Sequence, residues 1–255
     1  MQTKNGRQPS LSIEGHLATL CLNRPDLANR LDVEDLDVIR HCLDQVNLNQ
    51  EIRVLRLVAT GRHFCSGFNT GKVTGLDAGA LFETTAQALE KARPLTVVAI
   101  NGGIYGGATD LALACDFRIG VQGTAIFVPA AEIGLHFYGG GLERFVSRLG
   151  LAVAKRVLLA GERLDANLML ATGFLDQLVV GVDELQVETD RFSRHLAQMA
   201  PLAVQGMKRH LNGIARGAVD SEALKRDLGS AQISKDLLEG VKAKAEKREP
   251  VFIGA

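Results

Sequence analysis

The segment from Leu95 to Asp116 constrains the fold most, because glycines separate two apolar runs within it. The first run, 95–100, is short and rich in Val and Ile, which favours a buried strand. It stops at Asn101-Gly-Gly103, and Gly106-Gly107 open a second run whose apolar residues can pack on one side of a helix. We therefore predict a strand, a tight turn and a buried helix.

The glycines at the start of this helix are compatible with a binding site. Glycine allows a ligand to approach the main chain closely, and the first N–H groups of a helix have no partner within it. Such an N–H attracts an oxyanion. A two-glycine turn is more often an ordinary left-handed turn, so this feature alone identifies no site.

A second stretch, 59–69 (ATGRHFCSGFN), also follows an apolar strand and ends in a turn. Together, Phe64-Cys-Ser-Gly-Phe68 and Asn101-Gly-(x)3-Gly-Gly107 resemble motifs of the crotonase, or enoyl-CoA hydratase/isomerase, superfamily. The resemblance covers nearly the whole chain. Its further motifs are Leu22-Asn23-Arg24-Pro25, Cys115-Asp116, Gly134-Leu135, Gly139-Gly140-Gly141 and the Ala160-Gly161-Glu162 turn.

The resemblance implies an α/β protein with the crotonase (ClpP-like) fold, a repeated ββα spiral core with a C-terminal helical oligomerisation region. We assign residues 1–195 to the core with the acyl-CoA site and 196–255 to the helical trimerisation region.

Residue patterns predict the individual elements. The strands are expected at 11–14, 16–22, 54–58, 95–100, 117–120, 125–128 and 178–180. The helices are expected at 32–48, 80–91, 106–115, 142–149, 151–159, 166–171, 183–199, 201–214, 218–238 and 241–247.

Composition limits the classes of partner. The chain has 255 residues, 46% of them hydrophobic, enough for one large domain with an appendage. Lys plus Arg and Asp plus Glu number 29 each, so no global field favours nucleic acid or an anionic membrane. The four cysteines lack Cys-x-x-Cys spacing, which indicates reduced thiols and no zinc site. With no apolar leader segment, we expect a cytoplasmic protein that binds neither nucleic acid nor membrane.

The resemblance assigns an oxyanion hole to the main-chain N–H groups of Phe68 and Gly107. A thioester carbonyl that becomes enolate-like needs two such donors, and removing one typically costs about 3 to 4 kcal/mol of barrier. The alternative is that Phe68 is a core aromatic residue with an ordinary turn amide.

The acid/base residues depart from the family pattern. Hydratases of this family carry one glutamate three residues after the second donor and another directly after a proline, and Asp110 and Ala130 occupy these positions here. Water addition needs one group to orient water and another to protonate carbon, and alanine can do neither. The isomerase type keeps only the second glutamate, so Ala130 weakens that reading too. Asp110 is either the base or a first-turn charge that offsets the helix dipole.

Three further catalytic candidates follow in the loop where crotonase relatives with other chemistries place a reactive Asp or His. His136 carries an imidazole, a common general acid or base, Tyr138 lies beside the glycines, and Glu132 is close enough in sequence to replace the missing carboxylate at position 130. A structural hydrogen-bonding role is the alternative for each of them.

For CoA, the resemblance implies contacts from the Arg24 loop, the backbone around Ala28, Lys72, and Lys247 from a neighbouring subunit. Phosphates need cations, although an isolated lysine or arginine is also typical of a solvated surface. No metal-ligand spacing or dinucleotide-binding turn is present in the sequence, so we expect no cofactor, with acyl-CoA as the substrate.

We therefore predict an acyl-CoA enzyme of the enoyl-CoA hydratase/isomerase type, a lyase or isomerase, that stabilises a thioester enolate with an atypical acid/base set. The family's C-terminal helices build trimers, often doubled, so we expect a homotrimer or hexamer. One alternative is a member with another reaction, namely a decarboxylase, an isomerase that uses Asp110, or a carbon–carbon hydrolase that uses His136. The other is a non-catalytic acyl-CoA-binding homologue.

Overall fold

The structure is a computed structural model that describes residues 7–69 and 78–255. Its largest sheet has the strand order β1-β2-β3-β4-β6-β9, in which only the β1–β2 pair is antiparallel. These strands are β1 (Ser10–Glu14), β2 (Leu17–Leu22), β3 (Val54–Ala59), β4 (Leu95–Ile100), β6 (Phe117–Val121) and β9 (Gln177–Val179). A smaller sheet contains β5 (Ile104–Tyr105), β7 (Ala125–Phe127) and β8 (Leu164–Asp165). The predicted α/β class is confirmed.

Strand β4 is buried at every position, because both faces of the large sheet are covered. Val98 and Ile100 belong to the core beneath the helices of one face, whereas Val97 and Ala99 belong to a second core on the other. The predicted strand 95–100 therefore lies inside the large sheet, between β3 and β6, and the glycine turn follows directly at its carboxyl end.

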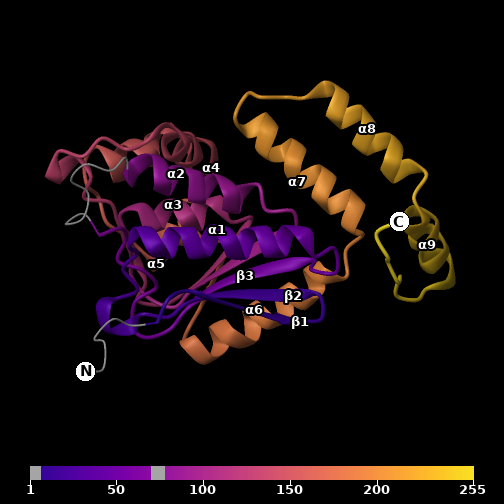
Figure 1. The fold of residues 1–255 in the computed structure, drawn as a ribbon, viewed down its shortest axis with the longest axis horizontal. Helices are drawn as coiled ribbons and strands as arrows, with labels where there is room; N and C mark the ends of the chain where they lie inside the picture. Colours follow the sequence, from indigo (N-terminus) through magenta and orange to yellow (C-terminus); the bar gives the residue numbers. More distant parts are fainter. Residues whose placement is uncertain (1–6, 70–77) are drawn as a thin grey trace.

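Helices cover the two faces unequally (Figure 1). One face carries α1 (Val33–Leu48), α2 (Ala78–Glu90), α3 (Gly107–Ala114) and α4 (Gly139–Leu158), and the other carries α6 (Val182–Ala197); α5 (Ala166–Ala171) follows β8. The apolar stripe predicted for the first helix is buried at Leu36, Ile39, Leu43 and Val46. Within α4 the backbone leaves helical geometry at Gly150, which has φ of 78°, so the predicted break between 149 and 151 is confirmed.

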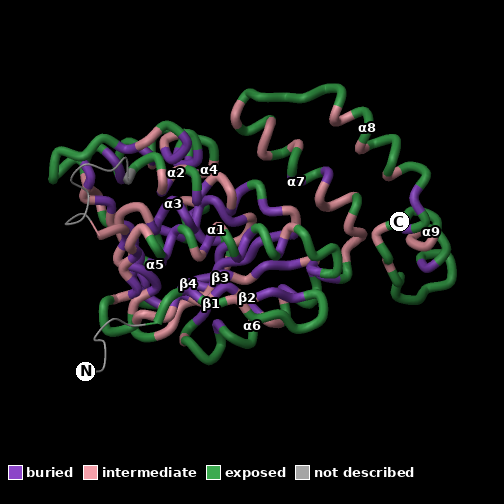
Figure 2. The backbone as a smooth tube through the Cα atoms, in the orientation of Figure 1, coloured by how far each residue is buried: buried purple, intermediate pink, exposed green. Residues whose placement is uncertain are grey.

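The C-terminal helices stand away from the sheet (Figure 1) and are mostly exposed (Figure 2). They are α7 (Pro201–Ala215), α8 (Ser221–Gln232) and α9 (Lys235–Glu246). The single helix predicted over 218–238 is wrong, as is a separate helix at 241–247. The Ser234 hydroxyl accepts a hydrogen bond from Leu237 N at 3.0 Å and so begins a new helix that runs through Glu246. Helix α6 ends at Ala197, close to the boundary predicted at 195, which stays a prediction.

Candidate active site

The two glycine turns singled out in the sequence lie against each other. Cys65 O accepts a hydrogen bond from Tyr105 N at 3.0 Å, and Phe64 N donates to Gly103 O at 3.0 Å. Gly67 has φ of 89°, and a Cβ on it would lie 2.7 Å from Tyr105 O. Only glycine permits this approach. Segments about forty residues apart in sequence thus meet at the carboxyl ends of β3 and β4.

The peptide planes at these turns fix the direction of the two candidate donors. Gly67 O accepts from Leu31 N at 2.9 Å, so the N–H of Phe68 on the same trans peptide points away from Leu31. Gly106 O accepts from Thr109 N at 3.1 Å, so the N–H of Gly107 points out of the amino end of α3. Neither N–H donates a hydrogen bond to another residue of the described chain. Their role as an oxyanion hole stays a prediction.

An aromatic wall stands beside these amides. The Phe82 ring from α2 would lie 3.0 Å from a Cβ at Gly107. Its centroid is 6.3 Å from that of Phe68, edge to face, and 6.3 Å from that of Tyr138. The wall is apolar except for the tyrosine hydroxyl. Such a surface suits an acyl chain and excludes water from the neighbouring amides.

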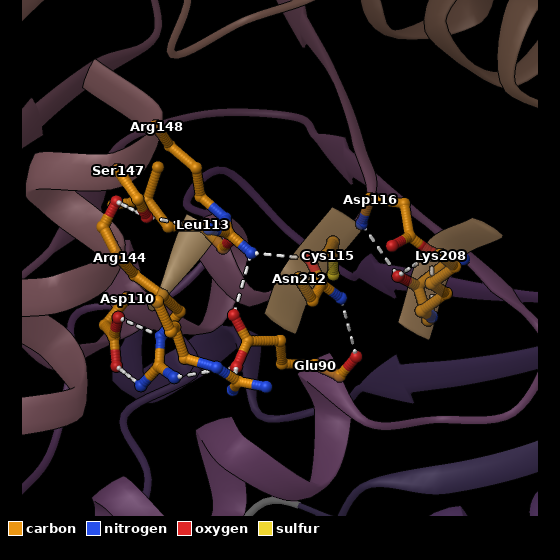
Figure 3. A network of polar contacts seen from close by, with 12 residues as sticks. Glu90, Asp110, Leu113, Cys115, Asp116, Arg144, Ser147, Arg148, Lys208 and Asn212 are labelled. Carbon is orange, nitrogen blue, oxygen red and sulfur yellow. Dashed lines mark hydrogen bonds and ion pairs between the residues drawn. The ribbon is translucent and has the colours of Figure 1, made fainter. Parts of the chain in front are cut away.

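Asp110 is fully buried, and both oxygens of its carboxylate accept hydrogen bonds from neighbouring side chains (Figure 3). Arg144 donates from Nε to Oδ1 and from Nη2 to Oδ2, both at 2.7 Å, and the Tyr138 hydroxyl also donates to Oδ2 at 2.7 Å. This bidentate pair leaves little of the carboxylate for a substrate proton. Asp110 was predicted as base or helix-dipole charge, and the geometry adds a third role, that of anchor for Arg144 and Tyr138.

The charges in this cluster reinforce one another. Burial and the nearby Asp110 charge raise the pKa of Tyr138, so the phenol stays protonated. Burial alone would lower the pKa of Arg144, but its hydrogen bonds and the charges of Asp110 and Glu90 raise that pKa overall. Tyr138 is therefore held neutral with its proton directed at Asp110.

The ionic cluster continues away from the turns through Glu90, the last residue of α2. This carboxylate is 1% exposed and lies 3.5 Å from Arg144 Nη1, 2.7 Å from Arg148 Nη2 and 2.5 Å from Arg216 Nη1. Arg216 follows α7, so the cluster ties the C-terminal helices to the core. Figure 3 shows Glu90 between Arg144 and Arg148.

The remaining acid/base candidates lie nearer the surface. Glu132 is exposed, and its Oε1 would lie 2.8 Å from a Cβ at Gly161, so the side chain packs against the turn at 160–162. His136 is exposed, with Nδ1 2.7 Å from Phe137 O. Ala130 is buried at the start of a short 3-10 helix. Of the four catalytic candidates, the structure brings Asp110 and Tyr138 together and places Glu132 elsewhere. All four stay predictions.

Two polar residues near the site were not identified from the sequence. Arg144 is a buried arginine that follows the exposed Glu143 and precedes Phe145, and this mixed local sequence gives no signal of its burial. Glu83 accepts a hydrogen bond from Gly140 N at 2.6 Å, which places a half-buried carboxylate at the start of α4. No sequence signal distinguishes Glu83 from an ordinary helix-surface residue.

The predicted CoA residues have different environments. The Arg24 guanidinium forms a bidentate pair with Asp35 at 2.7 and 2.9 Å, so it is engaged within the protein. Ala28 has φ of 49°, and its carbonyl accepts from Ser66 N at 2.8 Å, which places this loop beside the first turn. Lys72 lies outside the described residues. Lys247 directly follows α9, a helix that stands apart from the sheet within one chain (Figure 1).

The cysteines offer no nucleophile here. Burial raises the pKa of the Cys65 thiol to about 12, and its Sγ lies 3.0 Å from Asn29 O. Within the described residues, no group of three or more His, Cys, Asp or Glu side chains could hold a metal ion. Over 7–69 and 78–255, no helix is both long and apolar enough to cross a membrane.

Comparison with known proteins gives consistent matches over the whole chain. The family model described as enoyl-CoA hydratase/isomerase matches residues 12–255. YngF of Bacillus subtilis is 28% identical over 252 residues, which cover 94% of this chain and 95% of that protein. Crotonyl-CoA hydratase of Syntrophomonas wolfei is 27% identical over 252 residues, which cover 95% and 96%. An enoyl-CoA hydratase structure from Bacillus anthracis aligns with a TM-score of 0.89 at 28% identity, covering 98% of this chain and 100% of that one. The predicted crotonase fold is confirmed.

The Asp110–Arg144 pair gives a direct test of the buried cluster. Arg144→Met should lower the free energy of unfolding by roughly 3 to 5 kcal/mol, because it leaves the carboxylate buried without its partner. Urea denaturation measures this change. The double variant Asp110→Leu/Arg144→Met should lose less free energy of unfolding than the single variant, since neither member of the pair is then left buried without its partner.

Lys225→Met, at an exposed ion pair with Glu222, is the matched control and should change the free energy of unfolding little. Equal losses for Arg144→Met and Lys225→Met would show that Asp110 does not depend on Arg144 for its burial.

Proposed function

The chain belongs to the enoyl-CoA hydratase/isomerase family, and from that premise we propose that it acts on acyl-CoA thioesters through an enolate held by the N–H groups of Phe68 and Gly107. The observation that carries this proposal is the contact between the two turns, which leaves both amides without a partner in the described chain. Preorganised donors of this kind stabilise charge as it develops on the carbonyl oxygen. The family match and the relatives' descriptions support an enzyme over a non-catalytic acyl-CoA-binding homologue.

We propose that the acid/base set differs from two glutamates. Asp110, held by Arg144, orients the Tyr138 hydroxyl rather than removing a substrate proton itself. The tyrosine oxygen keeps a lone pair with which it can hold water or a substrate hydroxyl beside the aromatic wall. With Ala130 in place of the second carboxylate, water addition lacks its usual pair of groups. Enolate formation and reprotonation is therefore the reaction class that this site supports best, and the C2 proton needs an acceptor other than Asp110. We propose Glu83 for this role, because its half-buried carboxylate accepts only the Gly140 N–H, at 2.6 Å, among the described residues and follows Phe82 of the aromatic wall on α2.

A homotrimer, or a hexamer formed from two trimers, is proposed for the assembly. Met207, Leu211 and Ile214 recur at helical spacing on α7, and each is more than half exposed. A stripe of this kind is typical of a surface that another subunit covers. Four free cysteines agree with the reducing compartment expected from the sequence, and we propose a cytoplasmic location.

Substitution of Gly107 by proline removes one donor selectively. Proline is tolerated at the first position of a helix, where Gly107 lies, but it carries no N–H. Gly107→Ala is the matched control, because either substitution adds a Cβ about 3.0 Å from the Phe82 ring and alanine keeps its N–H. We expect Gly107→Pro to exchange the C2 protons of butyryl-CoA with D2O about 100 to 1,000 times more slowly than Gly107→Ala. Equal rates, or no exchange by the unmodified protein, would refute the enolate mechanism.

Crotonyl-CoA tests the atypical acid/base set. We expect a hydration kcat well below the enzyme median of about 10 per second, because each general acid or base typically contributes about 100- to 10,000-fold. Loss of the conjugated absorbance of crotonyl-CoA follows the reaction. Hydration at or above that median would show that the chain has an efficient pair of groups that the structure does not reveal, and the proposed set would be wrong.

A further inference from the structure

A cavity of about 390 Å³ lies between the end of α2 and helix α7, away from the glycine turns. Its Lys208 donates to Pro94 O at 2.8 Å, directly before β4 begins, whereas Gly107 lies beyond the end of that strand. A six-residue strand spans about 20 Å, so the cavity and the candidate thioester site lie at opposite ends of the sheet. The volume falls in the range of about 300 to 1,000 Å³ that is usual for small-molecule sites.

Positive charge dominates the walls of this cavity. Lys91, Arg93, Lys208, Arg209 and Arg216 line it, and Glu90 is the one acidic residue among its described lining residues. Glu90 is shared by three arginines, one of which is Arg216. Lys208 pairs with Asp116 and Arg209 with Asp227, both at 2.8 Å, so Lys91 and Arg93 are the lining cations without a carboxylate partner in the described chain. The whole chain has no net charge, which means that this excess is local and does not follow from composition.

Several donors in the walls are not used within the protein. Among the described residues, Lys91 has no ion-pair or hydrogen-bond partner for its ammonium, and Arg216 uses only Nη1, toward Glu90. The Arg93 guanidinium donates from Nε and Nη2 to main-chain oxygens, including those of Asn49 at 2.6 Å and Ile52 at 2.8 Å, and its Nη1 donates to no described residue. Burial lowers the pKa of Arg93, so its charge is partly desolvated without a carboxylate beside it. A bound anion would relieve that cost.

We propose that this cavity is a second binding site, for a small phosphate-bearing anion. Two features favour phosphate over a single carboxylate. Guanidinium groups match phosphate oxygens with paired hydrogen bonds, and the two cations without a carboxylate partner line the same cavity as Arg216, which suits a ligand with more than one negative charge. Lys91, exposed and unpaired within the described chain, would close the site from the solvent side, while Arg93 and Arg216 hold the inner oxygens.

Titration calorimetry with inorganic pyrophosphate, at constant ionic strength near 0.15 M, tests the proposal. The unmodified protein should bind, and Lys91→Gln should bind at least about tenfold more weakly, since one charge-assisted contact is lost. Lys155→Gln is the matched control, because Lys155 is an exposed helix lysine elsewhere and should leave affinity unchanged. Inorganic phosphate in a parallel titration tells whether a single phosphate group is sufficient.

Three outcomes would overturn the proposal. Absence of binding at millimolar pyrophosphate is the first, and equal weakening by Lys91→Gln and Lys155→Gln, which indicates diffuse charge attraction, is the second. The third is loss of pyrophosphate binding in the presence of saturating butyryl-CoA, because the anion would then occupy the thioester site.

Sedimentation of Lys91→Glu adds a separate check. A changed subunit number without any pyrophosphate binding would mean that the cavity accommodates acidic residues of a second copy instead. Absence of pyrophosphate binding would not affect the proposed thioester chemistry at the two turns. Absence of C2 proton exchange would likewise not affect the proposed anion site.

Discussion

The contact between two backbone turns is the constraint on which the rest of the candidate site depends. Gly67 fits against Tyr105 O only because it has no side chain, and the left-handed φ at this glycine turns the next N–H away from Leu31. The second N–H is free because it opens a helix. Both amides are thus set by main-chain geometry at the ends of buried strands. Rigid strands and short turns make such a pair preorganised.

Around this backbone frame, an aspartate held in an ionic cluster and a buried alanine occupy the positions where the family's hydratases carry two glutamates. Asp110 cannot leave Arg144 without uncovering a buried charge, and Tyr138 is held by the same carboxylate. Through Glu90 the cluster reaches Arg216 and the C-terminal helices, which themselves contribute no residue to the two turns. We propose that this backbone frame binds the thioester, whereas the groups that would move protons differ from the two-glutamate pattern.

Sequence patterns predicted the elements that depend on local chemistry. The buried strand 95–100, the glycine break at 150 and the stripe of α1 all follow from hydrophobic periodicity and glycine conformation. The helix break near Ser234 was missed, because a serine cap inside a polar, helix-prone stretch gives little contrast. The partner of Asp110 was also missed, since Arg144 lies 34 residues away and only the packing of α3 against α4 brings the two together. Long-range pairs of this kind leave no mark on a single sequence.

The most direct measurement of the central claim is the carbonyl stretching frequency of bound [1-13C]butyryl-CoA, obtained by isotope-edited infrared difference spectroscopy. Two hydrogen bonds to the thioester oxygen weaken the C=O bond, so the band should move to lower frequency on binding and return most of the way in Gly107→Pro but not in Gly107→Ala. A band that stays at its aqueous frequency in the unmodified protein, with the ligand shown to be bound, would contradict the account.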